Sequence, residues 1–220
     1  MITSVLLDLD GTLTDPALGI TNCIAYALSR LDAAVPPVHE LHFAIGPPLR
    51  RTFATLLGTG EAAMIERAMV FYRERFAASG LFENTLYDGV PEMLATLKAR
   101  RFRLLLATAK PHIYARRILT HFGIHAPFDA IYGSELDGVR QHKGDLLAYL
   151  FHREAIDPRS AVMIGDRHHD IEAAHANGCL AIGVTYGYGS TDELVQADTL
   201  CMSPADIADA ISTLDTPVRS

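Results

Sequence analysis

Short apolar runs recur along the chain, and each ends at glycine or polar residues. They are continuous rather than alternating, which is typical of strands buried on both faces, as in a parallel sheet. The pattern therefore predicts strands at residues 5–7, 104–106, 130–132, 161–164 and 181–184.

Helical patterns lie between these runs from about residue 86 onward. Val90, Met93 and Leu97 recur at helical spacing, and similar stripes fall within 118–122, 146–150 and 169–177. Near the end, Ser203 and Asp206 have the spacing of a capping box. Alternation of strand and helix predicts an α/β fold with a doubly wound parallel sheet.

The segment between the first two predicted strands is too long for a single crossover helix. Its pattern is helical, with Ile20, Ile24 and Leu28 on one face and a later stripe of Ile65 and Met69. We therefore predict that residues 16–84 form a helical domain inserted after the first strand. Residues 1–15 and 85–220 then form the α/β core domain.

Charge and composition narrow the classes of partner. The 220 residues include 19 Lys and Arg against 26 Asp and Glu, a net charge of −7. Such a surface repels polyanions, so we expect neither nucleic acid nor a membrane as the partner. A small anionic ligand in a locally basic pocket stays compatible with this charge.

Localisation and redox state follow from two further features. The apolar run before Asp8 is too short for a signal peptide, and no stretch of about 18 uncharged apolar residues occurs. Cys23, Cys179 and Cys201 are far apart and are typical of buried residues in a reducing compartment, with a reactive thiol as the alternative. We expect a cytoplasmic protein.

Polar residues that carry chemistry follow the predicted strands. Ligands of doubly wound sheets bind at the carboxyl ends of the strands, so these residues should meet at one edge. Clustering of acids there costs repulsion unless a cation is bound. The residues are Asp8, Asp10, Gly11, Thr108, Ala109, Lys110, Lys143, Asp166 and Asp170.

The motifs DLDGTLTD, TAK and GDRHHD, with Lys143 between the last two, resemble those of the haloacid dehalogenase superfamily of phosphohydrolases. The resemblance runs from Ser4 to about Leu194. The phrases IGPPLRRTF, YDGVPEMLATLKARRFRL, GSELDGVRQHK and GVTYGYGSTDEL are most similar to the branch of phosphoglycolate phosphatases and bacterial 5′-nucleotidase-like proteins. The resemblance implies a Rossmann-like core with an inserted cap.

The resemblance implies a nucleophile at Asp8 and an acid and base at Asp10. A carboxylate at a strand end can form an aspartyl-phosphate. Asp10, two residues on in extended chain, would point the same way, and Gly11 permits a sharp turn near phosphate. The alternative is an Asp-rich turn without catalytic function.

The resemblance also implies Mg2+, held by the Asp8 side chain and the Asp10 carbonyl. Asp166 and Asp170 supply the hard oxygen ligands that Mg2+ prefers, although Asp170 also suits helix N-capping. The neighbouring His168 and His169 invite a transition-metal hypothesis. Adjacent helical residues diverge, so we expect a solvated pair instead.

Phosphate binding would be shared among the remaining residues of the edge. Thr108 would donate its hydroxyl and Ala109 its backbone N–H to phosphoryl oxygens, and Lys143 would neutralise charge. The family has proline after this lysine, where this chain has Gly144. Arg140 is a weaker alternative to Lys143, and Lys110 either assists phosphate or is solvated.

Residues 16–84 match the position of the family's small helical cap, which would exclude water and select the substrate. The segment GPPLRR resembles its specificity loop, so Arg50 would bind an anionic substrate group. The alternative is an exposed arginine at a helix start.

The sequence therefore predicts a Mg2+-dependent phosphatase for a small phosphorylated metabolite, a 5′-nucleotide or phosphoglycolate, acting as a monomer or homodimer. A phosphomutase is the second enzyme hypothesis, and a non-catalytic phospho-receiver-like switch is a hypothesis of another class. A dehalogenase is disfavoured, because a halide leaving group does not need the acid at Asp10. A nucleoside-triphosphate motor is disfavoured, because the motif G-x-x-x-x-G-K-[ST] is absent.

Overall fold

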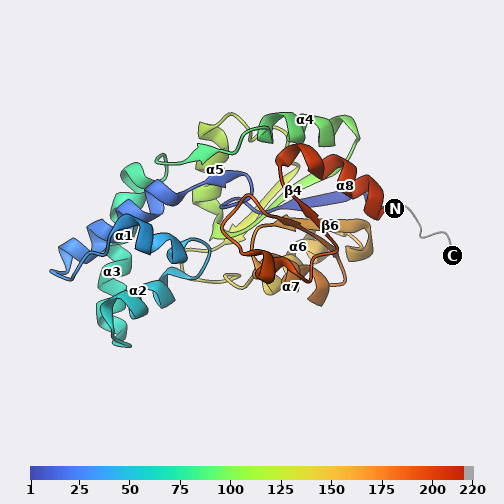
Figure 1. The fold of residues 1–220 in the computed structure, drawn as a ribbon. Coiled ribbons are helices and arrows are strands. Elements are labelled where there is room, and N and C mark those ends of the chain that lie inside the picture. Colours follow the sequence, from blue (N-terminus) through green and yellow to red (C-terminus); the bar gives the residue numbers. More distant parts are fainter. Residues whose placement is uncertain (216–220) are drawn as a thin grey trace. The chain divides into compact units, whose positions relative to one another are not determined.

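The computed structural model describes residues 1–215 and divides into two compact units (Figure 1). The first unit combines Met1–Thr14 with the chain from Leu86 onward, and the second is Asp15–Thr85. The long segment between the first two core strands thus packs mainly on itself. Each unit is described separately below.

The first unit is built on a six-stranded parallel sheet in the order β5-β4-β1-β6-β7-β8. β1 lies between β4 and β6, with Leu6 paired to Leu105 on one side and Met163 on the other. The strands are β1 (Ser4–Leu7), β4 (Arg103–Pro111), β5 (Ala130–Ser134), β6 (Ala161–Gly165), β7 (Leu180–Val184) and β8 (Thr199–Cys201).

Helices cover both faces of this sheet, which explains the continuous apolar runs. α6 and α7 bury Leu147 and Ile171 against the face that carries Leu6, Leu105 and Met163. α4 and α8 contact each other over the opposite face (Figure 1). The helices of this unit are α4 (Val90–Ala99), α5 (His112–His121), α6 (Lys143–Glu154), α7 (His168–Ala176) and α8 (Ile207–Leu214).

The second unit is helical and has its own apolar centre. Phe53 packs edge-on against Tyr72, and Tyr72 stacks on Phe76. Arg75 donates two hydrogen bonds of 2.8 Å to the carboxylate of Glu83. The helices are α1 (Ala17–Arg30), α2 (Leu49–Leu57) and α3 (Ala62–Arg75), and the two-residue strands β2 (Thr14–Asp15) and β3 (Thr85–Leu86) pair where the chain passes between the units.

The predicted α/β fold with a parallel sheet is confirmed, and all five predicted strands are present. The short strands β2, β3 and β8 were not predicted. The capping box of Ser203 and Asp206 is present, and all three cysteines are buried free thiols. Within residues 1–215, no helix is both long and apolar enough to cross a membrane.

Candidate active site

The sheet topology sets the position of the site. The chain moves from β1 to β4 and β5 on one side, and to β6, β7 and β8 on the other, so its direction switches beside β1. Ligands of open α/β sheets bind at such a switch, beyond the carboxyl ends of the strands. Asp8 follows β1 directly, and its N–H donates to the Ile164 carbonyl at 3.0 Å. The ladder therefore holds the Asp8 backbone in place.

Three carboxylates meet at this edge of the sheet. Asp8, Asp166 and Asp170 each offer an oxygen, and these oxygens lie within 4.8 Å of one another. The three residues are 8%, 1% and 1% exposed. Asp8 is far in the sequence from Asp166 and Asp170, and the parallel pairing of β1 with β6 brings it to them.

Asp170 has two functions that the sequence presented as alternatives. One oxygen, Oδ2, accepts from the Arg167 N–H at 3.1 Å and caps α7. The other, Oδ1, is bonded to Lys143 within the carboxylate cluster. Capping therefore orients Asp170 without removing it from the site.

Lys143, the first residue of α6, lies between two of these acids. Its Nζ is 2.9 Å from Asp8 Oδ1 and is also paired with Asp170. Burial by itself lowers the pKa of the Lys143 ammonium, but the charges of Asp170 and Asp8 outweigh it and raise the pKa above its usual range. Lys143 is therefore a permanent cation.

One lysine does not balance three acids. Burial, with the nearby Asp170 and Asp8, raises the pKa of Asp166 to about 7. Burial likewise raises the pKa of Asp170 to about 6, although Lys143 opposes this rise. The ionised cluster is thus costly by itself, and a bound cation would relieve that cost.

Asp10 pairs with a different lysine. Its Oδ2 lies 2.7 Å from Lys110 Nζ, and the Lys110 side chain is only 7% exposed. Lys110 is therefore part of this edge rather than a solvated lysine. Burial raises the pKa of Asp10, and Lys110 only partly counters it, so Asp10 holds a proton more readily than an ordinary aspartate.

The last part of β4, where its register with β5 shifts, positions a hydroxyl. Thr108 is 2% exposed, and its Oγ1 accepts from the Lys110 N–H at 3.3 Å. The Ala109 carbonyl accepts from the Ser134 hydroxyl at 2.8 Å. Leu7 of β1 pairs with Leu106 of β4, so Thr108, two residues further along β4, lies close to the end of β1 that Asp8 follows.

Two glycines allow other loops to approach Asp166. Gly11 has φ +84°, and a Cβ on it would lie 2.1 Å from Asp166 Oδ2. A Cβ on Gly187 would lie 2.4 Å from Asp166 Cβ. The Tyr188 N–H then donates to Asp166 Oδ2 at 2.8 Å, and the Tyr186 hydroxyl donates to the Thr12 carbonyl at 3.0 Å. This loop was not among the predicted site residues. Its GYG segment lies in the stretch GVTYGYGSTDEL, which resembles the family.

Arg50 belongs to the helical unit. It lies in the first turn of α2, where its guanidinium is paired with Glu66 of α3 and is half exposed. Its function in substrate binding stays a prediction. The structure brings together Asp8, Lys143, Asp166 and Asp170, and separately Asp10 with Lys110.

The carboxylate cluster fits a hard divalent cation. Asp166 Oδ1 is buried and has no hydrogen-bond partner among the described residues, so it is free to act as a ligand. All three acids offer oxygen, which Mg2+ prefers over nitrogen or sulfur.

The chain is similar to known proteins over most of its length. The sequence profile of the haloacid dehalogenase-like hydrolases matches residues 5–184. The chain belongs to this family. A 5′-nucleotidase from Pseudomonas aeruginosa is 48% identical over 191 residues, which cover 87% of this chain and 86% of that protein. The tyrosine-protein kinase PtkA of Mycobacterium tuberculosis is 40% identical over 207 residues, covering 94% of this chain and 70% of that protein.

Further relatives bear phosphatase names. A phosphoglycolate phosphatase from Haemophilus influenzae is 31% identical and covers 82% of this chain and 84% of its own. A solved structure from Clostridium acetobutylicum, described as a "predicted phosphatase", superposes with a TM-score of 0.91 at 39% identity. It covers 97% of this chain and 100% of its own. The chain is an enzyme of the phosphatase type within the haloacid dehalogenase-like hydrolases.

Proposed function

We propose that this haloacid dehalogenase-like hydrolase removes phosphate from a small phosphate monoester through an aspartyl-phosphate on Asp8, with Mg2+ as cofactor. One observation carries the proposal. Asp8 is a buried carboxylate at the switch of the sheet, paired with Lys143 at 2.9 Å and clustered with Asp166 and Asp170. Phosphoryl transfer depends on such positioning and charge stabilisation.

The proposed metal fits the acids already described. Asp8, Asp166 and Asp170 would hold Mg2+, with the Asp10 carbonyl as a further ligand by the family resemblance. When bound, the ion would neutralise charge on the nucleophile and the phosphoryl oxygens.

The two steps use Asp8 and Asp10 in turn. A carboxylate oxygen of Asp8 attacks phosphorus, the ester P–O bond breaks, and Asp10 gives its proton to the leaving oxygen. Water then attacks the phosphoryl group on Asp8 while Asp10 takes a proton from that water, and inorganic phosphate leaves. The pKa of Asp10, which burial raises above the usual range of an aspartate, suits this exchange, because the group holds a proton more readily and can return it.

The remaining polar groups orient the phosphoryl group. Thr108 would donate its hydroxyl and Ala109 its N–H to phosphoryl oxygens, and Gly11 leaves space for the group beside the turn. Lys143 pairs with Asp8 and holds its carboxylate in place. Lys110 steadies Asp10 and adds positive charge.

In this proposal the helical unit acts as a cap that selects the substrate, and Arg50 within it binds an anionic group of the substrate. A 5′-nucleotide is the first candidate, supported by the 48% identical relative that bears that name, and phosphoglycolate is the second. For Arg50 to bind an anionic group, its pair with Glu66 must open or be shared.

A second candidate function is transfer of the phosphoryl group to an acceptor other than water. It is supported by the relative named tyrosine-protein kinase PtkA, and a phosphomutase would share the same intermediate. In both cases the aspartyl-phosphate would have to resist attack by water.

The test is phosphate release from a panel of nucleoside monophosphates, phosphoglycolate and other monoesters with Mg2+. We expect turnover in the wild type and a loss on the order of 10³-fold or more in Asp8→Asn. Asp157→Asn is the matched control, because this exposed acid pairs only with its neighbour Arg159 in the contacts described.

Two results would overturn the proposal. One is full activity in Asp8→Asn, and the other is no phosphate release from any ester. Label that accumulates on the protein or on an acceptor, without release of phosphate, would favour the second candidate instead.

A further inference from the structure

A second group of metal-ligating side chains lies on the outer side of α7. His168, His169 and Glu172 each offer one ligand atom, and these atoms lie within 4.8 Å of one another. The two imidazole rings are 3.7 Å apart between centroids. From the sequence we predict that the two adjacent histidines diverge, and this prediction is wrong. His168 is the first residue of α7, after an Arg167 in extended conformation, so the rings are placed at a helix end.

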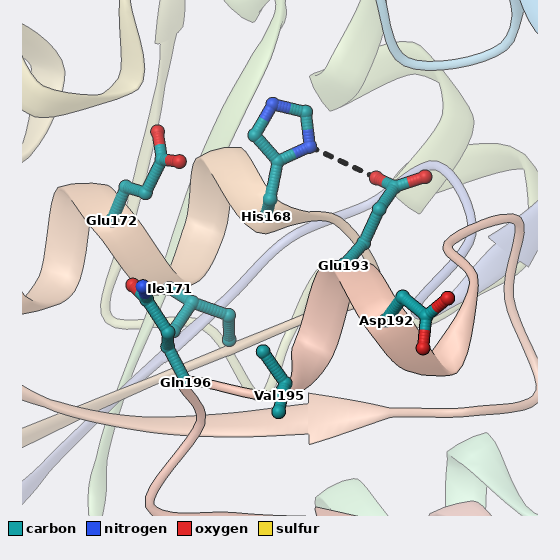
Figure 2. A pocket seen from close by; sticks show the side chains of 7 residues that line it. All are labelled: His168, Ile171, Glu172, Asp192, Glu193, Val195 and Gln196. Atoms are coloured by element: carbon teal, nitrogen blue, oxygen red, sulfur yellow. Dashed lines mark hydrogen bonds and ion pairs between the residues drawn. The ribbon is translucent and has the colours of Figure 1, made fainter.

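Glu193 orients one of these imidazoles. His168 Nδ1 lies 2.9 Å from Glu193 Oε2. A dashed line marks this interaction in Figure 2. A carboxylate only accepts, so in the neutral form of the ring Nδ1 carries the proton and Nε2 has the lone pair. Arg167 donates to the same Glu193 oxygen at 2.9 Å and fixes the carboxylate in turn. A carboxylate that holds one imidazole nitrogen is the usual support of a metal-binding histidine.

The surroundings leave room for a hydrated ion. His168, Glu172 and Glu193 line a hollow of about 310 Å³, together with Asp192 and Gln196 (Figure 2). Glu172 and His168 rise from the same helix toward the same side (Figure 2). Glu172, Asp192 and Glu193 make the lining of this hollow acidic, and Arg167 balances Glu193.

We propose that His168, His169 and Glu172 form a binding site for a transition-metal ion such as Zn2+, Ni2+ or Co2+. Two imidazoles and one carboxylate, with water completing the shell, are the donors that these ions prefer. Mg2+ prefers oxygen alone. The ion would therefore bind this site, while the oxygen-only cluster of Asp8, Asp166 and Asp170 would select Mg2+.

The two sites share one turn of helix. Asp170 lies between His169 and Glu172 in sequence and pairs with the buried Lys143, whereas His169 and Glu172 are exposed and His168 is partly exposed. An ion on the outer side would tie the first residues of α7 to one another. The proposal does not depend on the phosphatase assignment, since binding is measured without substrate.

The experiment is a calorimetric titration of the whole chain with Co2+ in the presence of millimolar Mg2+, followed by visible absorption of the bound Co2+. We expect one Co2+ per chain with a spectrum of mixed nitrogen and oxygen ligation. Affinity should fall at least about tenfold in His168→Gln/His169→Gln and in Glu172→Gln. His175→Gln is the control, because His175 is exposed on the same helix and pairs with Asp198.

Three outcomes would refute the site. One is binding of Co2+ by the double variant as tight as that of the wild type. Another is loss of binding only in Asp166→Asn, which would place the ion in the carboxylate cluster. No Co2+ binding at all by the wild type would also refute it. Glu172→Gln leaves both histidines in place, so loss in both variants reports ligation rather than disturbed folding.

Discussion

The two sides of the first turn of α7 hold opposite kinds of polar cluster. On the inner side, Asp170 joins Asp8 and Asp166 in a buried group with Lys143. On the outer side, His168 and its neighbours stay partly or fully exposed. Burial makes the inner charges costly, so the protein has to supply a balancing cation. Solvated groups carry no such cost. Metal binding by the outer cluster therefore depends on how its side chains are oriented.

The largest expected effect is on catalysis and comes from removing the positive charge of Lys143 from the inner cluster of carboxylates. Lys143→Met keeps the length of the side chain but leaves Asp8 and Asp170 without their cation. We expect phosphatase activity at saturating Mg2+ to fall about 10²–10³-fold, because charge stabilisation in the buried site is lost. Steady-state kinetics on the best ester of the panel measure the fall.

A lysine of the same unit provides the control for that substitution. Lys98 is exposed at the end of α4 and pairs with Asp129, so Lys98→Met should change activity less than about twofold. Equal losses in the two variants would mean that Lys143 acts only through the stability of the fold.

The second effect concerns stability in metal-free protein. The folded-state pKa of Asp166 is raised from 3.8 to about 7. The folded state therefore binds this proton more tightly than the unfolded state. The penalty is absent below pH 3.8 and grows until it is complete above pH 7. Asp166→Asn removes the penalty, so we expect it to stabilise the metal-free protein by about 2 kcal/mol at pH 8.

Chemical denaturation at two pH values tests whether Asp166→Asn stabilises the metal-free protein. The gain from Asp166→Asn should shrink at pH 5, where the wild-type Asp166 is protonated. Addition of Mg2+ should stabilise the wild type more at pH 8 than at pH 5 and should stabilise the variant little. A variant that is less stable than the metal-free wild type at pH 8 would contradict the assignment of repulsion to this cluster.

The smallest expected effect is on the affinity for Co2+ at the outer side of α7. Glu193→Gln removes the charge that holds His168 Nδ1, so Co2+ affinity should fall about tenfold without loss of the three ligands. Asp192→Asn is the matched control, because Asp192 lines the same hollow without a described bond to His168. Calorimetric titration compares the two, and a similar fall in both would show that general negative charge, not orientation, drives binding.

The sequence predicted the sheet well because its central strands are apolar on both faces. The runs at 5–7 and 161–164 have no polar position to mislead the assignment. β8 was not predicted because it is three residues long, pairs only with β7, and leaves Leu200 exposed. Its hydrophobic signal is no stronger than that of a loop.

The sequence predicted which residues follow the strands, but not how they pair. Topology alone brings Asp8 and Asp166 to one edge, whereas the partner of each acid depends on loop conformation. Lys110 therefore pairs with Asp10, and Lys143 with Asp8, which no spacing specifies. The Tyr188 N–H on Asp166 is 22 residues away in sequence, and a backbone donor has no residue-type signature.

The close approach of Gly11 and Gly187 to Asp166 has a consequence for the order of folding. These contacts join the loops after β1, β6 and β7, so they close long stretches of chain and are entropically expensive to form early. We expect the acidic cluster to assemble late, after the apolar core of the sheet has formed. The repulsion among its carboxylates is then met by a scaffold that is already stable, and it does not oppose the nucleation of the fold.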